Sequence, residues 1–276
     1  MRVLISADME GVTGVTCPDD VRPGSPRWEY FRVMLTADVN AAVAGFFAAG
    51  ADEVIVNEAH ANKRNLLIAD LDPRAVAIIG THKPFSMMEG IDSGVDAVAF
   101  IGYHAGAGVQ GVLSHTFIGT TVLGVTINGT AASEGMMNAA LAAEFGVPVV
   151  LVTGDDLTCG DAARWAPAAR RVAVKRCVDR YTAVCLPPAR TAELIEQAAA
   201  SALAEPAGRP ARPEGPFRYE VTFDATQAVA ACTAIPGVEQ TGPRSVGFTL
   251  PTMAKAIRCF RVVTVLAAAS AEADYG

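Results

Sequence analysis

The stretch SADMEG places two carboxylates at the end of an apolar run. The residues RVLISAD look like a buried β-strand, and Asp8 and Glu10 stand at its carboxyl end. Side chains alternate along a strand, so Asp8 and Glu10 share one face and Met9 lies on the other. Two carboxylates held this close repel one another and cost free energy unless a proton, a basic side chain or a metal ion lies between them.

Two of the chain's four histidines also follow apolar strand candidates directly. His60 ends the run VIVNEAH and His104 ends the run AFIGYH. In open α/β sheets, ligands bind outside the carboxyl ends of the strands, so we expect these two histidines to converge with Asp8 and Glu10. Glu134, in the first turn of a predicted helix, is placed to join them.

This set of side chains suits a metal ion. Oxygen and imidazole ligands without thiolate favour Zn²⁺, Mn²⁺ or Co²⁺. Three carboxylates and two histidines exceed what one catalytic zinc ion usually takes, and they fit two ions that share a bridging carboxylate. Such a pair, about 3.5–4 Å apart, activates a water and stabilises a developing oxyanion. Asn57 and Glu58 lie close to His60 in the sequence and are candidates to orient it.

Each of these residues also has a purely structural interpretation. An acidic pair at a strand end can begin a solvated loop, and a histidine there can be a hydrogen-bonded core residue. An acidic residue in a first helical turn is favoured by the helix dipole in any case. The coincidence of four such residues at strand ends, rather than any one of them, favours a functional site.

Four further motifs carry weaker signals. His115, in GVLSHTF, is a candidate nucleophile or general acid or base beside the metals, or a loop residue without a role. For His82 we expect a solvated loop position. Asp155 and Asp156 follow a strand and favour a helix cap over a supporting role at the site. GAGVQG (106–111) matches G-x-G-x-x-G, but the β-branched, glycine-broken sequence after it predicts no helix that could receive a pyrophosphate.

The elements that must position these residues alternate along the chain. Several strand candidates are continuous hydrophobic runs, as expected for parallel strands covered on both faces. Helix candidates with capping serines or prolines lie between them. The pattern predicts an α/β fold with a mainly parallel sheet flanked by helices. The strand candidates span residues 2–8, 52–59, 75–80, 96–104, 148–155 and 170–176.

A second, smaller domain is predicted at the C-terminal end. EPAGRPARPEGP (205–216) is typical of a linker, and a β-α-β-α pattern follows it. We therefore expect a metal-binding catalytic α/β domain over residues 1–205 and a small α+β domain over residues 206–276. The small domain would serve packing, a substrate wall or oligomer contacts. The dipeptide Asn128-Gly129 predicts a separate small antiparallel hairpin.

Composition narrows the class of protein. Hydrophobic residues make up 51% of the 276 residues and charged residues 18%, which favours a folded globular chain. The formal net charge of -7 argues against nucleic acid as a partner. No apolar run approaches the ~20 residues of a membrane span, and no signal-peptide pattern is present, so we expect a cytoplasmic protein without a membrane partner. None of the six cysteines forms a C-x-x-C pair.

Seven short motifs in one order resemble the self-compartmentalising D-aminopeptidase family of zinc metallopeptidases. They are SADMEG, VNEAHANKRNL, KPFSMMEG, GYHAGAG, LSHT, SEGMMNA and VTGDD, and they extend over roughly residues 1–176. The resemblance implies a co-catalytic centre with two Zn²⁺ per chain, in which Asp8 is the bridge and His115 is the catalytic histidine, proposed as nucleophile. The implied metal ligands are Asp8, Glu10, His60, His104 and Glu134.

The same resemblance implies an assembly and a substrate class. Family members are expected to form a ring-shaped homodecamer whose central chamber admits only short peptides. The family's type member acts on peptides with an N-terminal D-amino acid such as D-Ala. We therefore expect a zinc-dependent aminopeptidase that releases N-terminal amino acids from short peptides.

Three other functions are weighed against this one. An L-aminopeptidase or another metal-dependent hydrolase, such as an amidase or a phosphoesterase, would use the same site. A nucleotide-binding module built on GAGVQG is disfavoured by the sequence after that motif. An assembly protein with a vestigial site is disfavoured because the full set of candidate ligands is intact.

Overall fold

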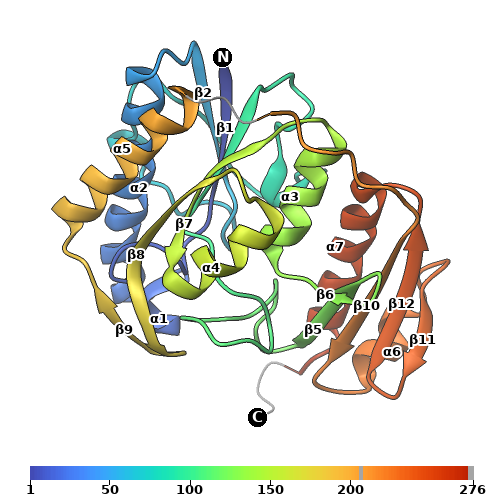
Figure 1. Cartoon of the computed structure of the whole chain (residues 1–276). Helices are drawn as coiled ribbons and strands as arrows, with labels where there is room; N and C mark the ends of the chain where they lie inside the picture. Colours follow the sequence, from blue (N-terminus) through green and yellow to red (C-terminus); the bar gives the residue numbers. More distant parts are fainter. Residues whose placement is uncertain (205–207, 273–276) are drawn as a thin grey trace.

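The computed structural model describes residues 1–204 and 208–272, and these residues form two sheets with helices around them (Figure 1). The strands of the larger sheet are β1 (Arg2–Ala7), β2 (Glu53–Glu58), β3 (Val76–Ile78), β4 (Ala97–Ile101), β7 (Val149–Asp155), β8 (Arg170–Asp179) and β9 (Thr182–Cys185). Those of the smaller sheet are β5 (Val122–Ile127), β6 (Thr130–Ala131), β10 (Phe217–Phe223), β11 (Glu239–Gly242) and β12 (Ser245–Leu250).

The described helices are α1 (Pro18–Val21), α2 (Pro26–Ala48), α3 (Glu134–Glu144), α4 (Asp156–Trp165), α5 (Pro188–Ala204), α6 (Gln227–Cys232) and α7 (Met253–Ala269). Three of the predicted starts are confirmed by their caps. The side chains of Ser25, Ser133 and Asp155 each accept a hydrogen bond from the backbone N–H three residues further on. Asp155 is therefore a helix cap, as the sequence indicated.

The larger sheet has the order β3-β2-β1-β4-β7-β8-β9, in which only the β8–β9 pair is antiparallel. The smaller sheet, β11-β12-β10-β5-β6, is antiparallel. The predicted class, a mainly parallel α/β sheet with a smaller α+β part, is confirmed. The antiparallel strand β9 was not predicted.

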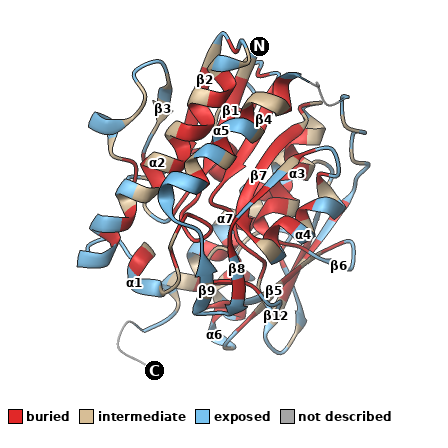
Figure 2. Cartoon of the chain, turned by 60° about the vertical axis from the view of Figure 1, so that its left-hand side comes forward, coloured by how far each residue is buried: buried red, intermediate tan, exposed pale blue. Residues whose placement is uncertain are grey.

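Alternate residues of the central strands face two separate cores. Val3 and Ile5 of β1 pack in the core that α2 and α5 cover, whereas Leu4 packs in the core that contains residues of α3, α7 and the smaller sheet. Figure 2 shows the central strands buried along their length. Coverage of both faces is the reason that these strands read as continuous apolar runs.

The order of the larger sheet reverses at β1. The chain first places β2 on one side of β1 and later places β4 on the other side. Ala7 at the end of β1 pairs with Glu58 of β2 and with Ile101 of β4, so the three strands end at the same level. Such a reversal leaves a crevice outside the carboxyl ends of the strands, where ligands bind in open α/β sheets.

The smaller sheet draws strands from two distant parts of the chain. The hairpin β5–β6, which turns at Asn128 and Gly129 with φ of 51° and 79°, pairs with β10 from the C-terminal part. Asn-Gly thus makes the predicted turn. Residues 205–207 of the predicted linker lie outside the described residues, and so does the boundary between 205 and 206. The division into domains 1–205 and 206–276 stays a prediction.

Helix α2 is more apolar than the sequence reading suggested. It is the one described helix with the length and mean hydropathy of a membrane span, with 23 residues and a hydropathy of 1.3. Within its 18-residue window, 56% is buried inside the protein. Leu35, Val39 and Phe46 belong to the core shared with α5 and β1, so much of the apolar surface of α2 is covered by the chain itself.

A buried lysine fixes the loop that follows β1. The Lys175 ammonium, on β8, donates hydrogen bonds to the carbonyl oxygens of Glu10, Val12 and Val15 at 2.6, 2.9 and 2.7 Å. These three carbonyls come from one irregular segment that makes no strand ladder of its own. Lys175 therefore satisfies buried backbone acceptors and sets the path of the residues that carry Glu10.

Replacing Lys175 by Met should destabilise the fold, because the carbonyl oxygens of Glu10 and Val15 lose their donor and each unsatisfied group costs about 1–3 kcal/mol. We expect a loss of at least about 2 kcal/mol in the free energy of unfolding, measured by urea denaturation. Lys255→Met, at an exposed position of α7, is the matched control and should stay within about 0.5 kcal/mol of the unsubstituted chain. A Lys175→Met variant as stable as this control would contradict the role given to Lys175.

Candidate metal centre

The predicted site residues line one cavity of about 200 Å³ at the carboxyl edge of the larger sheet. Five of them are buried, and His115 is half-buried. The structure therefore brings together every residue that the sequence proposed as a ligand, together with the candidate catalytic histidine. The set consists of Asp8, Glu10, His60, His104, His115 and Glu134.

Asp8 lies between two groups of side chains. Its Oδ1 is 3.2 Å from His60 Nδ1, and its Oδ2 is 3.5 Å from His104 Nε2. Glu10 Oε2 lies 3.1 Å from His60 Nδ1 on one side, and Glu134 Oε1 lies 3.5 Å from His104 Nε2 on the other. In each of the two groups the possible ligand atoms lie within 4.8 Å of one another. Asp8 is thus common to two triads, one with each of its oxygens.

The orientation of both buried histidines is set by backbone carbonyls. His60 Nε2 lies 2.8 Å from the carbonyl oxygen of Val21, and His104 Nδ1 lies 2.9 Å from that of Ala105. A carbonyl oxygen only accepts, so these ring nitrogens carry hydrogen and donate. The opposite nitrogens, His60 Nδ1 and His104 Nε2, face the carboxylates. Metal-ligating histidines are oriented in this way, with the second N–H held by a backbone or carboxylate oxygen.

The charges of the cluster are strongly coupled. Burial alone would raise the pKa of Asp8, but the adjacent imidazoles of His104 and His60 hold that pKa well below its usual range. Burial lowers the pKa of His60 and His104, yet the nearby carboxylates, Glu10 and Glu134 foremost, hold both values well above normal. The Asp8 carboxylate is therefore ionised, and positive charge must lie beside it. Protons and metal ions compete for the same ring nitrogens.

Buried polar atoms without a hydrogen-bond partner indicate that the cluster can bind zinc. Asp8 Oδ2, Glu10 Oε2 and His104 Nε2 are buried and have no hydrogen-bond partner within the described part of the chain. Polar atoms in such positions are normally satisfied, and orphaned ones call for an explanation such as a bound ion. Each triad offers nitrogen and oxygen donors with no thiolate. Three protein ligands with one position left for water or substrate is the arrangement of catalytic zinc.

His115 lies beside the cluster and is less buried than the five candidate ligands. Its Nδ1 is 2.8 Å from the carbonyl oxygen of Leu113, so Nε2 is left to face the cavity, 3.7 Å from Glu10 Oε1. Its ring stacks on that of His104, with centroids 4.2 Å apart. The carbonyl fixes which nitrogen is available. Glu10, His104 and His115 also lie close enough together to hold an ion, so geometry alone permits His115 as a ligand.

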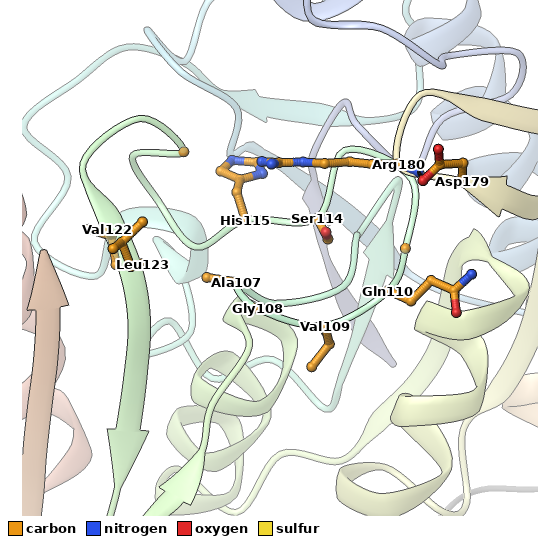
Figure 3. Close-up of a pocket in the computed structure, with 12 residues that line it drawn as sticks. Ala107, Gly108, Val109, Gln110, Ser114, His115, Val122, Leu123, Asp179 and Arg180 are labelled. Carbon is orange, nitrogen blue, oxygen red and sulfur yellow. Dashed lines mark hydrogen bonds between the residues drawn. The ribbon is translucent and has the colours of Figure 1, made fainter. Parts of the chain in front are cut away.

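His115 also faces a second cavity, of about 270 Å³ (Figure 3). Residues 107–111 of the glycine-rich loop line this cavity together with His115 and Arg180. No helix follows the loop before α3, so the structure offers no helix N-terminus for a pyrophosphate at GAGVQG, as the sequence indicated. The loop instead passes close to the candidate site.

The side chains around His60 are partly as predicted. The Glu58 carboxylate accepts a hydrogen bond from the backbone N–H of His60 at 2.9 Å and so helps to position it. Asn57 does not contact His60, and its side chain instead donates to the Met87 carbonyl oxygen. The prediction that Asn57 orients His60 is therefore wrong, because alternation along β2 turns Asn57 to the other face. His82 is exposed, as expected.

Two basic residues of the cavity were not predicted. Lys63 and Arg261 line the same cavity as the candidate ligands. Lys63 lies within the motif VNEAHANKRNL but carried no distinguishing signal, because lysines are common in polar loops. Arg261 comes from α7, far along the sequence, and only the tertiary fold brings it to the cluster.

Comparisons with known proteins agree with this geometry. The model of the family Peptidase_M55, described as D-aminopeptidase, matches residues 1–262. The D-aminopeptidase of Bacillus subtilis (strain 168) is 35% identical over 275 residues, which cover 97% of this chain and 98% of that protein. The solved structure of the zinc-dependent D-aminopeptidase DppA from Bacillus subtilis, a self-compartmentalizing protease, matches all of both chains with a TM-score of 0.93 and 32% identity. The resemblance found in the sequence is confirmed, and the chain belongs to the M55 family of D-aminopeptidases.

Proposed function

We propose that this chain is a zinc-dependent aminopeptidase that releases N-terminal D-amino acids, such as D-Ala, from short peptides. The observation that carries the proposal is the pair of triads that share Asp8. The full-length similarity to a zinc-dependent D-aminopeptidase supports it. In this proposal Asp8, Glu10 and His60 would hold one zinc ion, and Asp8, His104 and Glu134 would hold the other, so that Asp8 is common to both sets.

The residues of the cavity have distinct tasks in peptide hydrolysis. When bound, two zinc ions supply a Lewis acid for the scissile carbonyl and lower the pKa of an attacking water. The neutral α-amino group of a substrate is a nitrogen ligand that this centre would accept, which favours cleavage at the amino end. His115 presents Nε2 to the cavity, because Nδ1–H is held by Leu113. That atom is positioned to attack the carbonyl or to transfer a proton.

We also propose that copies of the chain assemble into a homo-oligomer. The Bacillus subtilis relative is described as self-compartmentalizing, which requires several subunits around an enclosed space. The sequence resemblance implies a ring-shaped homodecamer, and a cytoplasmic location stays the expectation drawn from the sequence composition. Mass photometry of the purified protein would distinguish a decamer from smaller assemblies.

The first test measures the zinc content of the protein and its preference for D- or L-amino acids at the substrate's amino end. We expect protein purified without added metal to contain about two zinc ions per chain by mass spectrometry, and to release D-Ala faster than L-Ala from matched dipeptides. Bound metal with release of L-Ala alone would favour an L-aminopeptidase on the same site. If no metal is bound and the protein stays inactive after zinc is added, Asp8 and Glu10 have a structural role and the proposed function fails.

Glu10→Ala tests the ligand assignment. Removing one carboxylate from the first triad should lower zinc content from about two ions per chain to about one, since the second triad keeps its three ligands. Elemental analysis after dialysis measures this loss. Glu193→Ala, on the exposed side of α5, is the matched control and should keep both ions. Full occupancy in Glu10→Ala would count against the assignment.

His115→Ala separates a catalytic role from a ligand role. We expect turnover to fall by at least about 10²-fold, the usual contribution of a positioned proton-transfer group, while zinc content stays unchanged. His82→Ala, at an exposed loop histidine, should leave both quantities unchanged. If zinc is lost together with activity, His115 is a ligand in the group that it forms with Glu10 and His104, and its catalytic assignment fails.

A further inference from the structure

The cavity of the candidate metal centre has a cationic side that the proposed function does not use. Lys63, from the loop after β2, and Arg261, from α7, both line this cavity. Within the described residues neither side chain forms an ion pair with an aspartate or glutamate at salt-bridge distance. Two basic groups in the same concave site as the candidate ligands call for an anionic partner.

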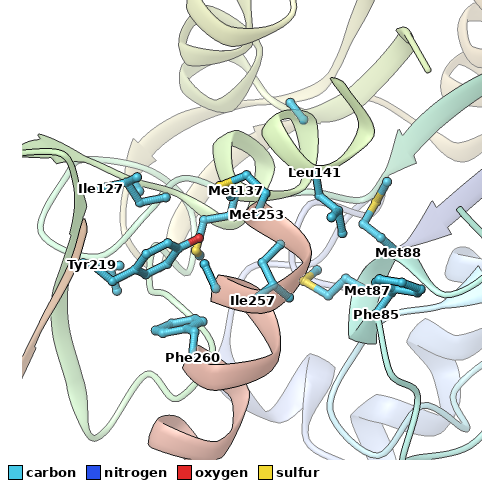
Figure 4. Packing of buried hydrophobic residues seen from close by; sticks show 14 of the residues in the cluster. Phe85, Met87, Met88, Ile127, Met137, Leu141, Tyr219, Met253, Ile257 and Phe260 are labelled. Carbon is cyan, nitrogen blue, oxygen red and sulfur yellow. The ribbon is translucent and has the colours of Figure 1, made fainter. Parts of the chain in front are cut away.

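Arg261 is held in place by the packing of α7. Figure 4 shows Met253, Ile257 and Phe260 of this helix packed into the apolar cluster beside α3. Phe260 is fully buried, so the residue after it has little freedom to move. The guanidinium Nη1 also donates a hydrogen bond to the carbonyl oxygen of Lys83. One edge of the guanidinium is thereby anchored on the protein.

The anchor itself is rigid. Lys83 is buried, and its ammonium donates to Asn57 Oδ1, to the Glu58 carbonyl oxygen and to the Ile78 carbonyl oxygen, each at 2.8 Å. Two of these acceptors belong to β2, the strand that leads to His60. Arg261 is therefore fixed relative to the candidate ligands, although it comes from the other end of the chain.

Lys63 is fixed by its backbone. It has a positive φ of 60°, a conformation uncommon for a residue with a side chain. Its N–H donates to the His60 carbonyl oxygen at 2.7 Å, and its carbonyl oxygen accepts from Gly80 N at 2.8 Å. Burial lowers the pKa of Lys63, while the charges of Asp8 and Glu134 act in the opposite direction. The ammonium thus lies within electrostatic reach of the candidate ligands.

A short peptide carries an anionic group close to the end that is cleaved. Its α-ammonium marks the end to be cleaved, and in a dipeptide its carboxylate lies only one residue away, since consecutive Cα atoms are about 3.8 Å apart. A cavity of about 200 Å³ holds a ligand of this size. Once divalent ions neutralise the three carboxylates of the cluster, Glu58 is the carboxylate left near Lys63. Its oxygens already accept hydrogen bonds from Asn65 and from the backbone N–H of His60. Paired cations of this kind bind carboxylates through charge-assisted hydrogen bonds.

Resting on the aminopeptidase function proposed above, we infer that Lys63 and Arg261 bind the free C-terminal carboxylate of the substrate. The metal centre then takes the amino end and the scissile carbonyl, and the two cations take the other end. This arrangement selects dipeptides with a free carboxylate over dipeptide amides.

The test compares D-Ala-D-Ala with its C-terminal amide, using zinc-loaded protein. We expect kcat/KM to be at least about tenfold higher for the free acid, with the difference in KM, because a charge-assisted hydrogen bond is lost in the amide. Lys63→Met and Arg261→Gln should each lower kcat/KM about tenfold or more for the acid, and change it less than about twofold for the amide. Arg258→Gln, an arginine on α7 that stacks on Phe85, is the matched control and should preserve the preference.

Binding measurements keep this inference separate from the function on which it rests. A reduced-amide analogue of D-Ala-D-Ala, which cannot be hydrolysed, is titrated calorimetrically in its acid and amide forms. Tighter binding of the acid that is lost in Lys63→Met and Arg261→Gln would support the carboxylate site even if no peptide is cleaved, in which case only the peptidase function fails. Hydrolysis of acid and amide at equal rates, or an equal loss of kcat on both substrates in the variants, would overturn the inference and leave the peptidase function standing.

Discussion

The structure of this site depends on how three buried carboxylates are compensated. Asp8, Glu10 and Glu134 are each no more than 4% exposed and lie at the end of an apolar sheet. An ionised carboxylate buried without a partner costs several kcal/mol, so a fold with three of them requires positive charge at the same place. The surrounding backbone prepares the site for that charge: carbonyls hold one N–H of His60 and one of His104, and the opposite ring nitrogens face the carboxylate oxygens, where a proton or a metal ion would lie. The result is a preformed set of converging lone pairs.

The backbone must come unusually close to itself to build this set. The loops after β1 and β4 are in direct contact, with Gly11 N donating to the Gly102 carbonyl oxygen at 2.8 Å. A Cβ at Gly11 would lie 1.9 Å from the carbonyl oxygen of Tyr103, and one at Gly102, where φ is +72°, would lie 2.2 Å from that of Asp8. Only glycine fits either position. Because of this contact, the loop that carries the carboxylates meets the loop that carries His104.

Local sequence patterns were sufficient to predict the side of the cavity that carries the candidate metal ligands. They were insufficient for the side that carries the basic residues. Asp8, His60 and His104 each follow an apolar strand, and topology sends the ends of parallel strands to one edge, so their convergence follows from short-range signals. Arg261 has no such signal, because its position depends on how α7 packs. The pairing of β5 with β10 also joins residues far apart in the chain. Strand β9 is only four residues long and largely exposed, too short for an alternating pattern to mark it in the sequence.

The two sides of the cavity are coupled through a single apolar core. Leu4 of β1, Leu141 of α3 and Phe260 of α7 belong to one buried cluster that continues into the smaller sheet. Figure 1 places α7 between α3 and that sheet. Protein interiors are close-packed, so a change in how α7 lies on the sheet would be transmitted to Arg261 and, through Lys83, to the strand that leads to His60. The smaller sheet contributes none of the candidate ligands, yet by supporting α7 it determines the shape of the cavity in which those ligands act.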